Sequence, residues 1–158
     1  MSVWGALAGG FAGTIVLTTA LRAASELGLT RMDLPFLLGT VFTANRLLAK
    51  ALGYILHFAA GLVFALVYYA IFVAISSSGW WLGAVFGLAH ALFIGTVGNV
   101  LTFLHPRMGS PSTGANSTAL LEPPGFLMLN YGPQTPAVSI LAHITYGALV
   151  GGFTHLAS

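Results

Sequence analysis

Two histidines, each with a glycine four residues later, are the residues of this sequence best suited to chemistry. They are His57, followed by Gly61, and His143, followed by Gly147. Both lie in long apolar stretches, where polar side chains are costly and usually face the interior of a helical bundle. Counted from the charged ends of those stretches, the two imidazoles lie at a similar depth of about 8–10 Å at the rise of an α-helix. We therefore expect them to face each other, with the glycines leaving room for a flat ligand.

Three kinds of ligand suit such a pair. Two neutral imidazoles on facing helices can be the axial ligands of haem b. Together with His105 they could instead hold a metal ion, since imidazole suits zinc, copper, iron or nickel. A third possibility is a hydrogen bond to a quinone carbonyl, with His90 nearby. The structural alternative is that the histidines bond backbone carbonyls or neighbouring side chains such as Ser139, Thr145 or Asn99 and hold the bundle together.

The elements that must position these histidines are membrane helices. The chain has 158 residues, of which 57% are hydrophobic and 5% charged, whereas soluble domains carry about a quarter charged residues. A bilayer requires about 20 apolar residues per helix. Such stretches lie at residues 3–21, 52–75, 80–104 and 136–156, separated by loops at 22–51 and 105–135 and by a short serine turn. The sequence predicts a single all-α membrane domain, a four-helix bundle.

The positive charges indicate an orientation for this bundle. Every Lys and Arg lies in the two longer loops, and none lies at the termini or in the serine turn. Because cytoplasmic loops carry the excess of Lys and Arg, we expect both loops in the cytoplasm and both termini outside.

Neither of these loops resembles a simple linker. The first contains an apolar run at 34–38, and Asp33 can cap a short interfacial helix there with Pro35 in its first turn. The second becomes apolar again at 125–129, which we expect to lie in the interface or against the helices. The charged residues that could gate a site or bind an anionic headgroup, or simply anchor the helices, are Asp33, Arg46, Arg107 and Glu122.

The two halves of the chain share a pattern. Each loop carries an acid, a proline and a phenylalanine in that order, and the helix after it carries the histidine with its glycine. This indicates a tandem repeat of a helix–interfacial loop–helix unit. Each unit crosses the membrane twice, so the two copies would be parallel.

Small residues at four-residue spacing form stripes on three of the helices. Such stripes let helices approach closely. They serve either a self-contained bundle or a face that docks a partner subunit. The glycines concerned are Gly5, Gly9, Gly13, Gly83, Gly87, Gly147 and Gly151.

Several short runs together resemble a known pattern. They are Met32-Asp33-Leu34-Pro35 with Gly39, His57-Phe58 with Gly61, Gly83-Ala84 with Gly87 and His90, His105-Pro106, Pro124-Gly125-Phe126, Asn130-Tyr131-Gly132, and His143 with Tyr146-Gly147. In these runs the chain resembles a group of small bacterial four-span membrane proteins of unknown function. The resemblance covers most of the chain. It implies a location in the bacterial cytoplasmic (inner) membrane and a four-span fold, and it carries no activity with it.

No catalytic signature accompanies the histidines. The sequence contains no cysteine, no phosphate-binding or dinucleotide-binding motif, no H-E-x-x-H and no G-x-S-x-G. It also lacks a basic patch for nucleic acid. Our leading expectation is a non-catalytic accessory subunit that packs in the lipid bilayer against a larger membrane complex. The alternatives are a haem- or quinone-binding electron-transfer module and a metal or small-molecule transporter.

Overall fold

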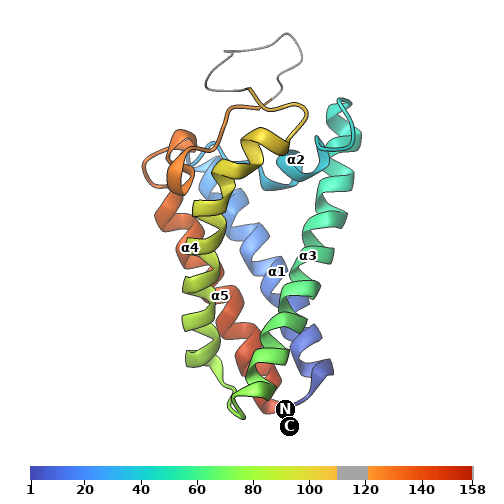
Figure 1. Ribbon diagram of the computed structural model, residues 1–158, viewed down its shortest axis with the longest axis vertical. Coiled ribbons are helices and arrows are strands. Elements are labelled where there is room, and N and C mark those ends of the chain that lie inside the picture. Colours follow the sequence, from blue (N-terminus) through green and yellow to red (C-terminus); the bar gives the residue numbers. More distant parts are fainter. Residues whose placement is uncertain (110–120, 158) are drawn as a thin grey trace.

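Four long helices form a bundle in the computed structural model, which describes residues 1–109 and 121–157 (Figure 1). They are α1 (Val3–Glu26), α3 (Arg46–Ala74), α4 (Trp80–Leu104) and α5 (Thr135–Leu156), each with a segment long and apolar enough to cross a membrane. Such segments are helical because lipid offers no partners to backbone N–H and C=O groups. The predicted all-α, four-helix fold is confirmed. Residues 110–120 of the predicted second loop lie outside the described part of the chain.

Two of the helices are longer than predicted. α1 continues past the apolar stretch to Glu26, and α3 begins at Arg46 rather than at residue 52. The start of α3 is fixed by Asn45, whose side chain accepts hydrogen bonds from the backbone N–H groups of Leu47 and Leu48. Apolar composition marks the part of a helix that lies in lipid, whereas caps mark where the helix ends. The charged residues of the first loop therefore lie largely on helix ends.

Both interfacial segments predicted in the loops are ordered against the bundle. Asp33 caps the short helix α2 (Leu34–Gly39), with its Oδ1 accepting from the N–H of Phe36 at 3.0 Å, as predicted. The second segment is the 3₁₀ helix η1 (Phe126–Tyr131), in which Leu127 and Met128 have left-handed φ values of 51° and 62°. These segments close one end of the bundle, here called the charged end, and both termini lie at the opposite, terminal end (Figure 1).

Helix α5 packs closely against both α1 and α4, and the glycine stripes make this possible. A Cβ added at Gly83 of α4 would lie 2.0 Å from the carbonyl oxygen of Gly147, and one added at Gly87 would lie 2.2 Å from that of His143. Gly5, Gly9 and Gly13 of α1 face α5 in the same way, as does Gly151 toward Gly79. All seven predicted glycines are therefore covered by the chain's own helices.

The contact between α3 and α4 is made by aromatic rings. Phe72 and Phe86 stack with centroids 5.4 Å apart, and Phe64 lies 4.0 Å from the ring of His90. Large side chains thus fill the space between α3 and α4. In contrast, α4 and α5 approach closely enough for their backbones to meet.

The tandem repeat stays a prediction. The two corresponding helices pack differently: α5 packs against the long helices α1 and α4, whereas α3 packs mainly against α1 and α2.

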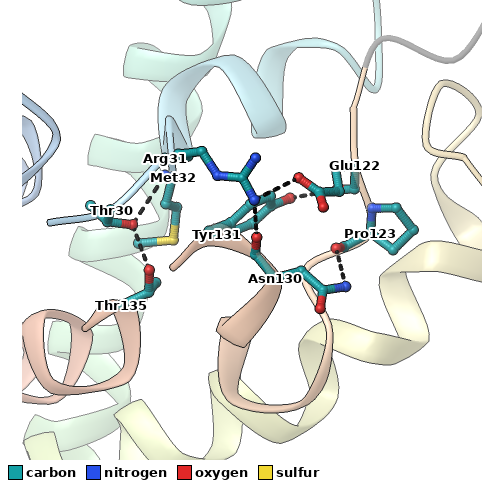
Figure 2. A network of polar contacts seen from close by, with 8 residues as sticks. All are labelled: Thr30, Arg31, Met32, Glu122, Pro123, Asn130, Tyr131 and Thr135. Atoms are coloured by element: carbon teal, nitrogen blue, oxygen red, sulfur yellow. Dashed lines mark hydrogen bonds and ion pairs between the residues drawn. The ribbon is translucent and has the colours of Figure 1, made fainter. Parts of the chain in front are cut away.

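A polar network joins the two loops at the charged end (Figure 2). The hydroxyl groups of Thr30 and Thr135 are 2.7 Å apart and buried. The guanidinium group of Arg31 donates to the backbone carbonyl of Asn130 and pairs with Glu122 at 3.1 Å. The hydroxyl group of Tyr131 donates to the backbone carbonyl of Glu122. The network fixes the chain just before Met32 and Asp33, which line the cavities described below.

Candidate functional site

Three of the predicted histidines line one cavity inside the bundle. His57 of α3, His90 of α4 and His143 of α5 surround a space of about 200 Å³, here called the chamber. Most of its wall is apolar, with Leu17, Leu34, Leu38, Phe64, Ile94 and Met128 among the lining residues. His57 and His143 were expected to face each other with His90 nearby, and all three line this cavity.

Two of these histidines have hydrogen-bond partners. The Nδ1 of His143 lies 2.8 Å from the carbonyl oxygen of Ser139, one turn earlier on α5, and therefore donates to it. The Nδ1 of His90 lies 3.3 Å from the hydroxyl oxygen of Tyr68. The two imidazoles contact each other edge to face, with centroids 5.0 Å apart. His143 thus makes the kind of contact that a purely structural role requires, a hydrogen bond to the backbone of Ser139 within α5.

His57 differs from the other two. Its side chain is buried, with 9% of the residue exposed. Its Nε2 has no hydrogen-bond partner among the described residues. A buried polar atom without a partner costs about 1–3 kcal/mol, and native proteins contain few of them.

Gly147, one turn after His143, does not line the chamber, contrary to the prediction, whereas Gly61 does. A Cβ at Gly61 would lie 2.0 Å from the side-chain oxygen of Thr14 on α1, and one at Gly147 would meet the backbone of α4. Both glycines are needed for close contact between helices. The spacing of residues along a helix could not show whether these glycines serve close helix packing or leave space for a ligand beside the imidazole.

His105 does not belong to the chamber, contrary to the predicted metal set. Its Nε2 lies 3.0 Å from the carbonyl oxygen of Leu37 and 3.3 Å from the hydroxyl oxygen of Thr40. Its Nδ1 accepts from the backbone N–H of Arg107. His105 therefore holds the end of α4 against the end of α2.

The four predicted interfacial charges have different environments. Arg107 donates to the carbonyl oxygens of Thr40 and Val41, just after α2. The guanidinium of Arg46 lies over the ring of Phe36, and Glu122 pairs with Arg31 as described above. These three anchor the loops and helix ends. Only Asp33 lines a cavity that adjoins the chamber.

That adjoining cavity, here called the mouth, has a volume of about 250 Å³ and lies at the charged end. Four charged side chains line it, and they form two ion pairs. Arg22 and Glu26 of α1 are 2.8 Å apart, and Lys50 of α3 lies 3.2 Å from Asp33. His57 lines both the mouth and the chamber, as do Leu21, Met32 and Leu34. The two cavities therefore adjoin at His57, with charge on one side and an apolar wall on the other.

The donor set and the dimensions restrict what could occupy this site. Among the described residues, no group of three or more His, Asp or Glu side chains is arranged to hold a metal ion. The chamber, at about 200 Å³, lies below the roughly 300–1,000 Å³ typical of pockets for drug-sized ligands. A single ring or part of one hydrocarbon chain matches the volume of the chamber.

Sequence reasoning missed the aromatic part of the chamber. Tyr146 lines it and donates to the carbonyl oxygen of Gly61, and Tyr68 bonds to His90. The signal was present, because residues 57, 61, 64, 68 and 72 of α3 follow the three- and four-residue spacing of a single helix face.

Comparisons with models of known protein families, with curated proteins and with solved structures find no match to this chain. Its function must therefore be argued from the site itself.

Proposed function

We propose that this chain binds one amphipathic membrane ligand where the mouth meets the chamber, with a carbonyl oxygen of the ligand accepting a hydrogen bond from Nε2 of His57. The observation that carries this proposal is the burial of that nitrogen, without a partner in the described chain, at the boundary between a charged and an apolar cavity. A ligand carbonyl would recover the cost of the unpaired atom. Quinones and acylated lipids both combine a carbonyl group with an apolar part.

The proposed setting is the bacterial cytoplasmic membrane, with both termini outside. The support is the distribution of Lys and Arg, all of which lie in the two longer loops or on the helix ends that adjoin them. In this orientation the mouth lies at the cytoplasmic interface, at the level of headgroups and ester carbonyls. The ligand would then come from the cytoplasmic leaflet.

The role of accessory subunit in a larger complex stays a prediction. One of its supports was the set of glycine stripes, and these glycines are covered by the chain's own helices. Binding of an amphiphile requires no partner subunit, and it accounts for the unpaired nitrogen of His57, which a purely structural role leaves unexplained.

The direct test is native mass spectrometry of the protein purified in mild detergent, followed by extraction and identification of the bound molecules. We expect one amphiphile per chain in the wild type. His57→Leu should lose it, because leucine cannot donate a hydrogen bond, whereas His57→Gln, which keeps an N–H donor, should retain part of the occupancy.

The matched control is His155→Gln, a histidine replacement on α5 near the terminal end. It should leave occupancy unchanged. If His57→Leu is folded and retains the wild-type occupancy, the proposal is wrong. If the wild type carries no stoichiometric amphiphile and acquires none from added quinone or lipid, the proposal also fails.

A further inference from the structure

The mouth is the charged half of the proposed site, and its charges balance. Arg22 and Lys50 supply two positive charges, and Glu26 and Asp33 supply two negative ones. An anionic ligand would meet two carboxylates and a cationic ligand would meet two cations. The lining is complementary to a group that carries both charges.

Both ion pairs are accessible enough to exchange partners. The side chains of Arg22 and Glu26 are 62% and 65% exposed, and those of Lys50 and Asp33 are 49% and 43% exposed. Exposed pairs of this kind contribute little to stability. A ligand can therefore replace each internal pair by a pair with itself at small cost.

The sequence of environments across the cavity matches the parts of one class of molecule. From outside inward there are the charged mouth, the unpaired Nε2 of His57, and the apolar chamber. A phospholipid presents a charged headgroup, an ester carbonyl and an acyl chain in the same order. A quinone, whose head is neutral, would leave the four charges of the mouth unused.

We infer that the ligand is a zwitterionic phospholipid with a primary ammonium group, such as phosphatidylethanolamine, an inference that rests on the proposed function. The phosphate would pair with Arg22 and Lys50, and the ammonium group would donate hydrogen bonds to Glu26 and Asp33. The ester carbonyl would accept from His57, and the upper part of one acyl chain would enter the chamber. Phosphatidylcholine has no N–H with which to donate to the carboxylates.

The test places the full-length protein in nanodiscs that contain equal amounts of phosphatidylethanolamine, phosphatidylcholine, phosphatidylglycerol and a long-chain quinone, and measures bound species by native mass spectrometry. We expect phosphatidylethanolamine to be enriched about tenfold over each of the others, equivalent to about 1.4 kcal/mol. Soluble glycerophosphoethanolamine should not displace it, because that molecule has no acyl chain for the chamber.

The decisive variant is the double substitution Glu26→Gln and Asp33→Asn. Asparagine also caps helices well, so α2 should persist, but Arg22 and Lys50 lose their acidic partners. The preference should then shift to the anionic phosphatidylglycerol. The matched control is Glu122→Gln, which removes an acid from an ion pair at the same end but outside the mouth, and it should leave the preference unchanged.

Each other outcome separates the two proposals. Equal binding of all lipids, preferential binding of the quinone, or an unchanged preference in the double variant overturns the inference on headgroup chemistry and leaves amphiphile binding intact. Displacement by soluble glycerophosphoethanolamine, which has no acyl chain, overturns the use of the chamber and with it the amphiphile proposal. Absence of any bound species from the wild type overturns both.

Discussion

At the scale of single residues, replacing His57 should have opposite effects on the stability of the protein and on its binding of lipid. In protein stripped of lipid, we expect His57→Leu to raise the midpoint of thermal unfolding, because leucine removes a buried unpaired nitrogen that costs about 1–3 kcal/mol. The same change should abolish the further rise in midpoint that added phospholipid gives the wild type. The measurement is thermal unfolding in detergent with and without lipid.

His105 supplies the contrast for that experiment. Both of its ring nitrogens have hydrogen-bond partners, so His105→Leu should lower the midpoint and leave the response to lipid in place. A lower midpoint for lipid-free His57→Leu would mean that its imidazole is satisfied in the protein, and the basis for ligand binding would be lost.

Tyr131 should make stability depend on alkaline pH. Burial and the nearby Glu122 raise the pKa of Tyr131 to about 12, although Arg31 opposes them, whereas an unfolded tyrosine has a pKa near 10. Tyr131 therefore contributes stability that is fully present below about pH 10 and is lost as the pH rises toward 12.

The comparison with Tyr131→Phe isolates this contribution from other groups that titrate in the same range. The midpoint of the wild type minus that of the variant should be largest below pH 10 and should decrease from pH 10 to 12. A difference that stays constant with pH would show that the phenol does not remain neutral in the folded state.

The histidines show how much of the site the spacing of residues in the sequence can predict. His57 and His143 were predicted to face each other, with His90 nearby, because apolar surroundings leave a polar side chain few places other than the bundle interior. His105 was misplaced because its partner, the carbonyl oxygen of Leu37, lies 68 residues away in the chain. Spacing along one helix holds no information about a contact of that kind.

At the scale of elements, two adjacent glycines of α5 test the packing. A Cβ at Gly151 would lie 2.3 Å from the carbonyl oxygen of Gly79, whereas one at Gly152 would meet its nearest atom, in the side chain of Trp80, at 3.7 Å. We expect Gly151→Ala to lower the unfolding midpoint strongly, because the backbone of the neighbouring helix must move.

The neighbouring change serves as its control. Gly152→Ala should raise stability slightly, by up to about 1 kcal/mol from helix propensity alone. Thermal unfolding and far-ultraviolet circular dichroism of the two variants are the measurements. Equal effects of the two substitutions would contradict the close contact between α5 and the start of α4.

The bounds of the helices were predictable where the need to cross the lipid bilayer determines them. Lipid requires long apolar helices, so the spans at 80–104 and 136–156 match α4 and α5 to within one residue. The asymmetric packing, with α5 against both α1 and α4, was not predictable, because every helix carries small residues. Which stripes meet depends on backbone approach that only the assembled bundle shows.

At the scale of the whole molecule, the bundle is polarised along its axis. All Lys and Arg residues lie in the two longer loops or on the helix ends beside them. These loops are at the charged end, and both termini lie at the terminal end (Figure 1). The chamber lies deeper, among the helices. The positions of the loops, the positive charges and the cavities are therefore all aligned along the bundle axis. The orientation of this axis in the membrane decides which leaflet supplies the ligand.

The absence of cysteine from the sequence makes that orientation directly testable. Ala44→Cys places a thiol at an exposed position of the charged end, and Ser77→Cys places one in the exposed turn between α3 and α4. Because positive charge favours the cytoplasmic side, a membrane-impermeant maleimide should label Ser77→Cys in intact cells. It should label Ala44→Cys only after permeabilisation. The reverse pattern would place the mouth on the outer face, and the ligand would then have to come from the outer leaflet.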